Sequence, residues 1–176
     1  MAKIEVPYDA HIPLLLKSLS RGGALLVAAE ERDHPNVMTI GWAQIGVIWG
    51  RHIMSIMVRP SRYTYQCLEA GHDFTVCVPY PGQADEVLFC GTESGRDYDK
   101  FEECSFTAVA SDGLTAPYID ECGVCYQCQV VNHADFVPEH IMPDICQQCY
   151  NSGDYHRIYF GQILKVVADE DVAARM

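Results

Sequence analysis

Short apolar runs, each ended by glycine, proline or a polar cluster, dominate this sequence. They are rich in β-branched and aromatic residues, which is typical of strands, and none approaches the roughly 20 apolar residues of a membrane span. We predict strands over 24–29, 36–49, 53–58, 74–78, 124–131 and 158–168, and short helices over 61–70, 84–90 and 98–104. Residues 133–155 are expected to form a long loop with one helical turn in it. This order predicts a mainly β fold, a β-barrel with short helical insertions, rather than a doubly wound sheet.

The run over 36–49 is largely apolar on both faces of the predicted strand. Such a strand is either buried on both sides or lines a ligand. Gly41 and Gly46 suggest a bulge or a close approach of the backbone to another group. Asn36, Thr39 and Trp42 add hydrogen-bonding groups and an aromatic surface, although a segment of this kind more often forms a hairpin and core than a cofactor site.

Charge is unevenly distributed along the chain. The 176 residues include 12 basic and 24 acidic ones, so the net charge is −12, which argues against non-specific binding to nucleic acid or to an anionic membrane. Residues 34–68 nevertheless contain no Asp or Glu, but they include Arg51, Arg59 and Arg62. Burial explains the apolar part of this window. An anionic ligand such as a phosphate would explain the arginines.

The start of the sequence has no signal-peptide pattern, because Glu5, Asp9 and Lys17 interrupt any apolar stretch. We therefore expect a cytoplasmic protein. The nine cysteines are an odd number, and without a secretory signal they are expected to be reduced thiols rather than a disulfide framework.

The turn that follows the predicted strand 53–58 has the composition of a phosphate site. Arg59 ends the strand, Pro60 follows, and Ser61 is expected to cap a helix whose first free amides belong to Arg62 and the next two residues. Free amides, the positive end of the helix dipole and two guanidinium groups would converge there. The alternative is a well-capped helix with two solvated arginines.

The cysteine spacing admits three interpretations. Cys122-x-x-Cys125 and Cys146-x-x-Cys149 satisfy a four-cysteine zinc spacing. Residues three apart in a strand point to opposite faces, however, which disfavours a metal site along the stretch that runs to Cys128. Cys146 and Cys149 could instead form a redox dithiol. Buried or incidental thiols are the favoured interpretation, and no metal ligand is predicted.

Four segments together resemble the flavin reductase-like family: NVMTIGWAQIGVIWG, VRPSRYTYQCLEAGHDFTVCVP, CGTESGRDYDKF and GDYHRIYFGQI. The resemblance runs from about Gly22 to Val167, and it predicts a single domain over residues 1–176. It implies the FMN-binding split-barrel fold and a homodimer with FMN near the subunit interface, FAD being the alternative flavin. No nucleic acid or membrane partner is expected.

The resemblance also implies a site. The flavin ring would lie against residues 36–44 and the phosphate beside the turn after Val58, so the implied cofactor residues are Asn36, Met38, Thr39, Trp42, Ala43, Gln44, Arg59, Ser61, Arg62, Tyr63, Thr64 and Lys100. Lys100 matches a family position where a cation would stabilise the anionic reduced flavin; the alternative is a solvated helix face. His156 matches the family's glycine-and-histidine motif and is the expected catalytic residue, facing the nicotinamide or helping to protonate flavin N5. The alternative is a hydrogen-bonded structural histidine.

These expectations converge on an FMN-binding oxidoreductase. The favoured activity is a flavin reductase that takes a hydride from NADH or NADPH at flavin N5 and passes electrons to a flavin, an iron species or a protein acceptor. The first alternative is a flavoredoxin-like electron carrier without enzymatic activity, to which redox proteins dock. The second is a four-cysteine metal protein of unrelated function.

Overall fold

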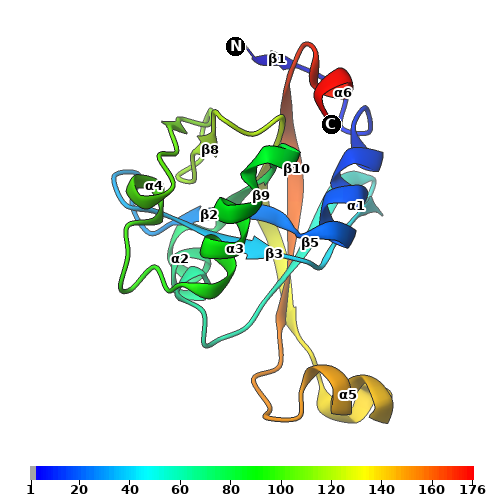
Figure 1. The fold of residues 1–176 in the computed structure, drawn as a ribbon. Helices are drawn as coiled ribbons and strands as arrows, with labels where there is room; N and C mark the ends of the chain where they lie inside the picture. Colours follow the sequence, from blue (N-terminus) through cyan, green and yellow to red (C-terminus); the bar gives the residue numbers. More distant parts are fainter. Residues whose placement is uncertain (1–2) are drawn as a thin grey trace.

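A computed structural model describes residues 3–176. Its main sheet has antiparallel strands in the order β3-β2-β6-β9-β10-β5-β4. The strands β3 (Pro35–Ile40) and β4 (Ala43–Ile48) are consecutive in the chain but lie at opposite ends of this order. Only Gly41 and Trp42 connect them, so the sheet has to curl until its two ends meet (Figure 1). Within the described residues β3 and β4 do not pair, and the barrel is split between them.

This architecture confirms the predicted mainly β split barrel, but the prediction of one strand over 36–49 is wrong. The chain leaves the sheet at Gly41 and Trp42, where a Cβ added to the glycine would meet nothing within 4 Å. The remaining strands have the following bounds: β1 Lys3–Glu5, β2 Ala24–Ala29, β5 Arg51–Val58, β6 Asp73–Val78, β7 Ala108–Val109, β8 Tyr118–Ile119, β9 Val124–Asp135 and β10 Arg157–Asp169.

Helices cover the barrel and close its ends. Their bounds are α1 Ile12–Arg21, α2 Tyr63–Gly71, α3 Ala84–Thr92, α4 Lys100–Glu103, α5 Pro143–Cys149 and α6 Val172–Arg175, with 3₁₀ turns η1 Pro81–Gln83 and η2 Pro138–His140. The sequence prediction missed α1, although the proline at its start is a helix signal. None of the helices in the described part of the chain has the length and apolarity needed to cross a membrane.

Two layers of core side chains fix this arrangement. The barrel interior holds Leu26, Met54, Phe74 and Tyr126, all with no measurable exposure. A second cluster lies between the outer side of the sheet and the helices α3 and α4, and it includes Phe101. Because β2 contacts both layers, all six of its residues are buried, which explains its continuous apolar run.

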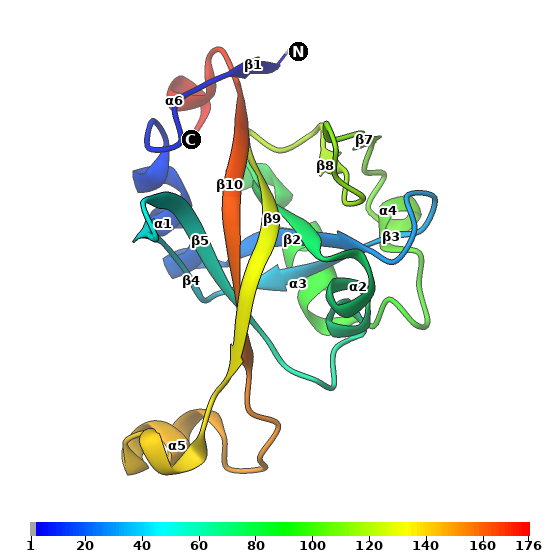
Figure 2. The same cartoon turned by 180° about the vertical axis from the view of Figure 1, so that it is seen from behind.

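The hairpin of β9 and β10 extends beyond the barrel and carries α5 at its far end (Figures 1 and 2). The predicted loop over 133–155 is shorter than expected, since β9 continues to Asp135, and the helical turn expected within it is α5. The returning segment reaches the barrel again at His156, immediately before β10 begins. The extension thus brings a distant part of the sequence to the split.

Candidate functional site

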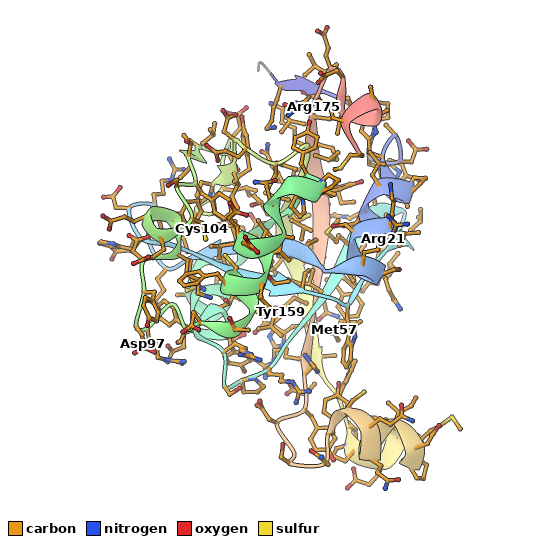
Figure 3. All side chains as sticks on the ribbon, in the orientation of Figure 1. Arg21, Met57, Asp97, Cys104, Tyr159 and Arg175 are labelled. Carbon is orange, nitrogen blue, oxygen red and sulfur yellow. The ribbon has the colours of Figure 1, made fainter. Side chains whose placement is uncertain are left out.

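A cavity of about 180 Å³ opens at the split of the barrel. Residues 38–42 form one wall, since they span the end of β3 and the two-residue connection to β4. Met57 (labelled in Figure 3), Arg59, Arg62 and His156 complete the lining. The cavity exists because the sheet curls without closing. We call it the split cavity.

A second cavity of about 160 Å³ adjoins the first, and Met38 and Arg62 line both. It lies between the start of α2 and the segment that joins α3 to α4, with Lys100 at its base. We call the two together the trough. Glu93 is the only carboxylate among its lining residues, against four cationic side chains, Arg59, Arg62, Arg96 and Lys100. The trough is therefore a cationic groove in an acidic chain.

The structure brings most of the predicted site residues to this trough. Its walls include Asn36, Met38, Thr39, Trp42, Arg59, Ser61, Arg62, Tyr63, Thr64, Lys100 and His156. Ala43 and Gln44 are not among the lining residues. Both belong to β4, which has already turned away to the other end of the sheet, so Ala43 packs against the barrel core and Gln44 is exposed.

Ser61 does not cap α2, contrary to the sequence prediction. The N-cap residue is Arg62, without a side-chain capping bond, and the Ser61 hydroxyl donates to Oδ2 of Asp154 at 2.6 Å. The competing carboxylate comes from the segment after α5, which the sequence could not place beside the turn. The Arg62 amide, expected to be free, donates to the Arg59 oxygen at 3.0 Å. Within residues 3–176 the amides of Tyr63 and Thr64, the first two of α2, keep their hydrogen-bonding capacity, and both residues line the trough.

The two arginines of the turn have different tasks. Arg59 donates to the carbonyl oxygens of Asp154 at 3.0 Å and Cys149 at 2.8 Å, and its guanidinium lies 5.1 Å from the ring centre of Tyr150. It therefore fixes the segment that follows α5. Arg62 is exposed at the junction of the two cavities, and its side chain forms no hydrogen bond or ion pair within residues 3–176. Arg62 is the guanidinium that remains free for an anion.

Lys100 is a buried cation, only 4% exposed. Its Nζ donates to the carbonyl oxygen of Cys90 at 2.9 Å, and within the described chain it forms no ion pair with a carboxylate. Burial lowers its pKa because the charged form loses hydration. The alternative of a solvated helix face is therefore wrong. Two ammonium hydrogens remain for a group in the trough, and an anion there would offset the cost of burial.

His156 forms the wall of the split cavity together with Trp42, at 4.8 Å between ring centres. Its Nδ1 lies 2.7 Å from the hydroxyl of Tyr150. Burial, together with the positive charge of Arg59, lowers the pKa of His156 to about 4. The ring is therefore neutral at pH 7 and presents a polar edge without a charge.

The cysteine pairs of the zinc-like spacing are separated in space. Cys122 and Cys125 are buried at the barrel end of β9, whereas Cys146 and Cys149 both belong to α5, which lies beyond the other end of this 12-residue strand (Figure 1). A strand of this length spans about 40 Å, so the pairs cannot share one ion. Within residues 3–176 no group of three or more His, Cys, Asp or Glu side chains is placed to hold a metal.

Comparison with known proteins gives consistent matches. The model of the family described as "Flavin reductase like domain" matches residues 16–176. An uncharacterized protein of Archaeoglobus fulgidus is 30% identical over 142 residues, which cover 81% of this chain and 69% of that protein.

Solved structures share the fold at lower identity. Flavoredoxin from Methanosarcina acetivorans has a TM-score of 0.69 at 23% identity, with 97% of this chain and 77% of that chain covered. Flavoredoxin of Desulfovibrio vulgaris (Miyazaki F) has a TM-score of 0.67 at 22% identity, with 85% and 70% covered. An FMN-binding domain of a flavin reductases-like enzyme from Shewanella baltica OS155 has a TM-score of 0.66 at 18% identity, with 96% and 78% covered.

Proposed function

Because this chain belongs to the flavin reductase-like family, we propose that it binds FMN in the trough and acts as a flavin-dependent oxidoreductase. The observation that carries the proposal is the unneutralised positive charge of the trough. Lys100 is buried without a carboxylate partner, and Arg62 is unpaired within residues 3–176, although the chain has a net charge of −12. An anionic ligand accounts for both cations.

The residues of the trough fit the two chemically different parts of FMN. Arg62 and the first amides of α2 would hold the phosphate, with Tyr63 and Thr64 beside it. Met38, Met57 and Trp42 offer apolar and aromatic surface for the ring in the split cavity. FAD, whose phosphates could use the same groups, is the alternative flavin.

Bound flavin would supply two-electron redox chemistry, and the protein would supply position and electrostatics. The Lys100 ammonium would stabilise negative charge on the adjacent part of the ligand. His156 is neutral at pH 7, so its proposed task is to hold a hydrogen bond and to shape the substrate side of the split cavity. Arg59 keeps His156 in place indirectly, because it fixes the preceding segment at Asp154.

The affinity for FMN tests the proposal. Replacing Arg62 by Ala should weaken FMN binding by about 1–3 kcal/mol, the usual scale for a charge-assisted hydrogen bond, which corresponds to about 5- to 150-fold in Kd. Quenching of flavin fluorescence on titration with apoprotein measures this. Arg32→Ala is the matched control, since Arg32 is exposed and lines neither part of the trough. Equal FMN affinity in both variants would contradict the phosphate assignment.

The electron donor and acceptor are proposed from the family alone. We propose NADH or NADPH as donor and a free flavin, an iron species or a protein as acceptor. The FMN-loaded protein should be mixed with each nicotinamide in a stopped-flow instrument without oxygen. The flavin absorbance should then fall at least as fast as the enzyme turns over when an acceptor is present.

A flavoredoxin-like electron carrier is the second candidate, and it is favoured by the fold shared with two flavoredoxins. In that case neither nicotinamide would reduce the bound flavin rapidly. A reduced redox protein that docks on this acidic chain would do so instead.

A further inference from the structure

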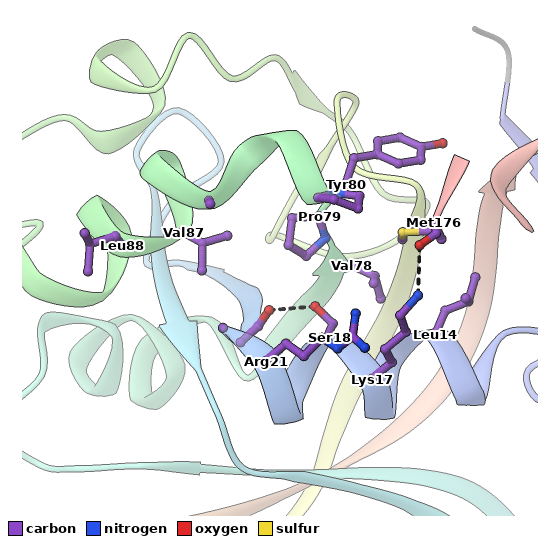
Figure 4. A pocket seen from close by; sticks show the side chains of 14 residues that line it. Leu14, Lys17, Ser18, Arg21, Val78, Pro79, Tyr80, Val87, Leu88 and Met176 are labelled. Carbon is purple, nitrogen blue, oxygen red and sulfur yellow. Dashed lines mark hydrogen bonds between the residues drawn. The ribbon is translucent and has the colours of Figure 1, made fainter. Parts of the chain in front are cut away.

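A cavity of about 410 Å³ lies apart from the trough, between α1, the end of β6 and the start of α3 (Figure 4). Its lining is mainly apolar and includes Leu14, Val78, Pro79, Tyr80, Val87 and Leu88. None of its lining residues also lines the trough. We call it the α1 cavity. Its volume is typical of small-molecule sites.

The charged side chains that line the α1 cavity both come from α1, and both are cationic. Lys17 and Arg21 are four residues apart on α1, so both project from one face of this helix (Figure 4). Lys17 donates to the backbone oxygen of Met176 at 2.9 Å. Arg21 forms no ion pair or side-chain hydrogen bond with any of residues 3–176. Among residues 3–176 no Asp or Glu lines the cavity, although acidic residues outnumber basic ones two to one in the chain.

We propose that the α1 cavity binds a small amphiphilic monoanion, a carboxylate with an aliphatic or aromatic body. The body would lie against Val78, Pro79 and Val87, and the carboxylate would accept hydrogen bonds from the free Arg21 guanidinium. Burial of the apolar body would supply most of the binding free energy. The guanidinium would favour an anionic ligand over a neutral or cationic one of the same size.

The surroundings select against a more highly charged ligand. Ala84 lines the cavity at the first turn of α3, and the next two residues, Asp85 and Glu86, are acidic. A phosphate dianion near this turn would meet their negative charge, whereas the α2 end of the trough has no acidic residue in its first turn. The two sites thus differ in the anion that each prefers.

The same residues separate the α1 cavity from the trough, so each cavity would bind its own ligand. Thr39, which lines the split cavity, donates a hydrogen bond to the backbone oxygen of Val87. Gly23 packs so closely on this wall that an added Cβ would lie 2.5 Å from the Thr39 methyl group and 2.8 Å from the Ile40 oxygen. This wall is close-packed and separates the two cavities. We therefore expect the carboxylate to bind in the α1 cavity whether or not flavin is bound in the trough.

Isothermal titration of the full chain with octanoate, octan-1-ol and octylammonium tests the proposal. We expect one octanoate site per chain, with octanoate bound about tenfold more tightly than octanol and octylammonium the weakest. Arg21→Ala should reduce octanoate affinity about tenfold and leave octanol affinity unchanged. Arg32→Ala, which removes an exposed arginine that does not line the α1 cavity, should change neither.

A variant that fills the α1 cavity tests whether octanoate binds there. Ala84→Trp puts an indole into the cavity from an exposed position, so the fold should persist, as the far-ultraviolet circular dichroism spectrum would verify. It should abolish octanoate binding while FMN affinity stays at the value of the unmodified chain. Undiminished octanoate binding in folded Ala84→Trp, or equal affinities for octanoate and octanol in the unmodified chain, would overturn the proposal.

Discussion

His156 shows how burial, rather than residue type, sets the chemistry of a titratable group. The ring contacts Trp42 and receives one hydrogen-bond partner, the hydroxyl of Tyr150. Lys100 follows the same logic on the other side of the trough, where burial lowers its pKa and one carbonyl is its partner. Both groups lose hydration on burial, and one hydrogen bond within the protein offsets part of that loss.

The protonation of His156 can be measured directly. In an NMR titration its ring resonances should move with a midpoint near pH 4, well below the ordinary histidine value of about 6.5. The native ring resists the proton that an unfolded chain takes up below about pH 6.5. Its contribution to stability is therefore complete above that pH and is lost as the pH falls toward 4. His156→Gln should make the free energy of unfolding less dependent on pH in this window. A midpoint at 6 or above would refute the description of the site.

At the scale of elements, α4 is a single turn whose position decides where Lys100 lies. Such a short helix has little stability of its own. Asp99 caps it, since the carboxylate accepts hydrogen bonds from the amides of Phe101 at 3.0 Å and Glu102 at 3.2 Å. Phe101 anchors the turn in the outer core cluster. The cap and the anchor together hold an ammonium in a buried place.

Removing this cap should affect both stability and the site. Asp99→Ala is expected to reduce the free energy of unfolding by about 1 kcal/mol, the typical cost of a lost N-cap, and to weaken FMN binding because Lys100 loses its support. Asp99→Asn, which keeps a capping oxygen, should retain most of both. Asp97→Ala, an exposed change in the same loop, serves as the control in urea denaturation. A loss in Asp99→Asn as large as in Asp99→Ala would contradict the capping role.

At the scale of the whole molecule, strand β4, the turn between β4 and β5, and strand β10 present exposed large apolar side chains. Trp49 is 60% exposed and Leu164 is 51% exposed. The Trp49 ring packs edge-on against Phe160 at 6.2 Å between centres. Aromatic and aliphatic side chains grouped in this way are typical of protein interfaces. We propose that this face forms the homodimer that the family resemblance implies.

Light scattering after size-exclusion chromatography measures this assembly. The unmodified chain should elute with twice the mass of 19.7 kDa. Trp49→Asp combined with Leu164→Asp should give a monomer, because two buried charges would destabilise the interface. Leu16→Asp introduces the same charge at a 51% exposed leucine of α1, and the dimer should persist. A monomeric unmodified chain, or a double variant that stays dimeric, would exclude this interface.

The sequence by itself determined the strand-rich architecture and the location of much of the cationic trough. Alternation, β-branched residues and glycine or proline stops are local signals, so the runs over 24–29, 53–58 and 74–78 lie within real strands. The absence of acidic residues from 34–68 likewise marked the segment that supplies much of the trough.

Only the tertiary structure decided which of these groups are free to bind. Arg59 and Ser61 are adjacent to Arg62 in the sequence, but Asp154 and Cys149, about 90 residues later, engage the first two and leave the third. The burial of Lys100 likewise depends on tertiary structure, namely on the packing of α4. The position of β4 at the far end of the sheet, after the connection through Gly41 and Trp42, does so too. The local sequence pattern determines backbone conformation and where charged residues stand. Which side chains are buried, and which form hydrogen bonds or ion pairs, depends on contacts between residues far apart in the chain. Those contacts exist only once the barrel has curled.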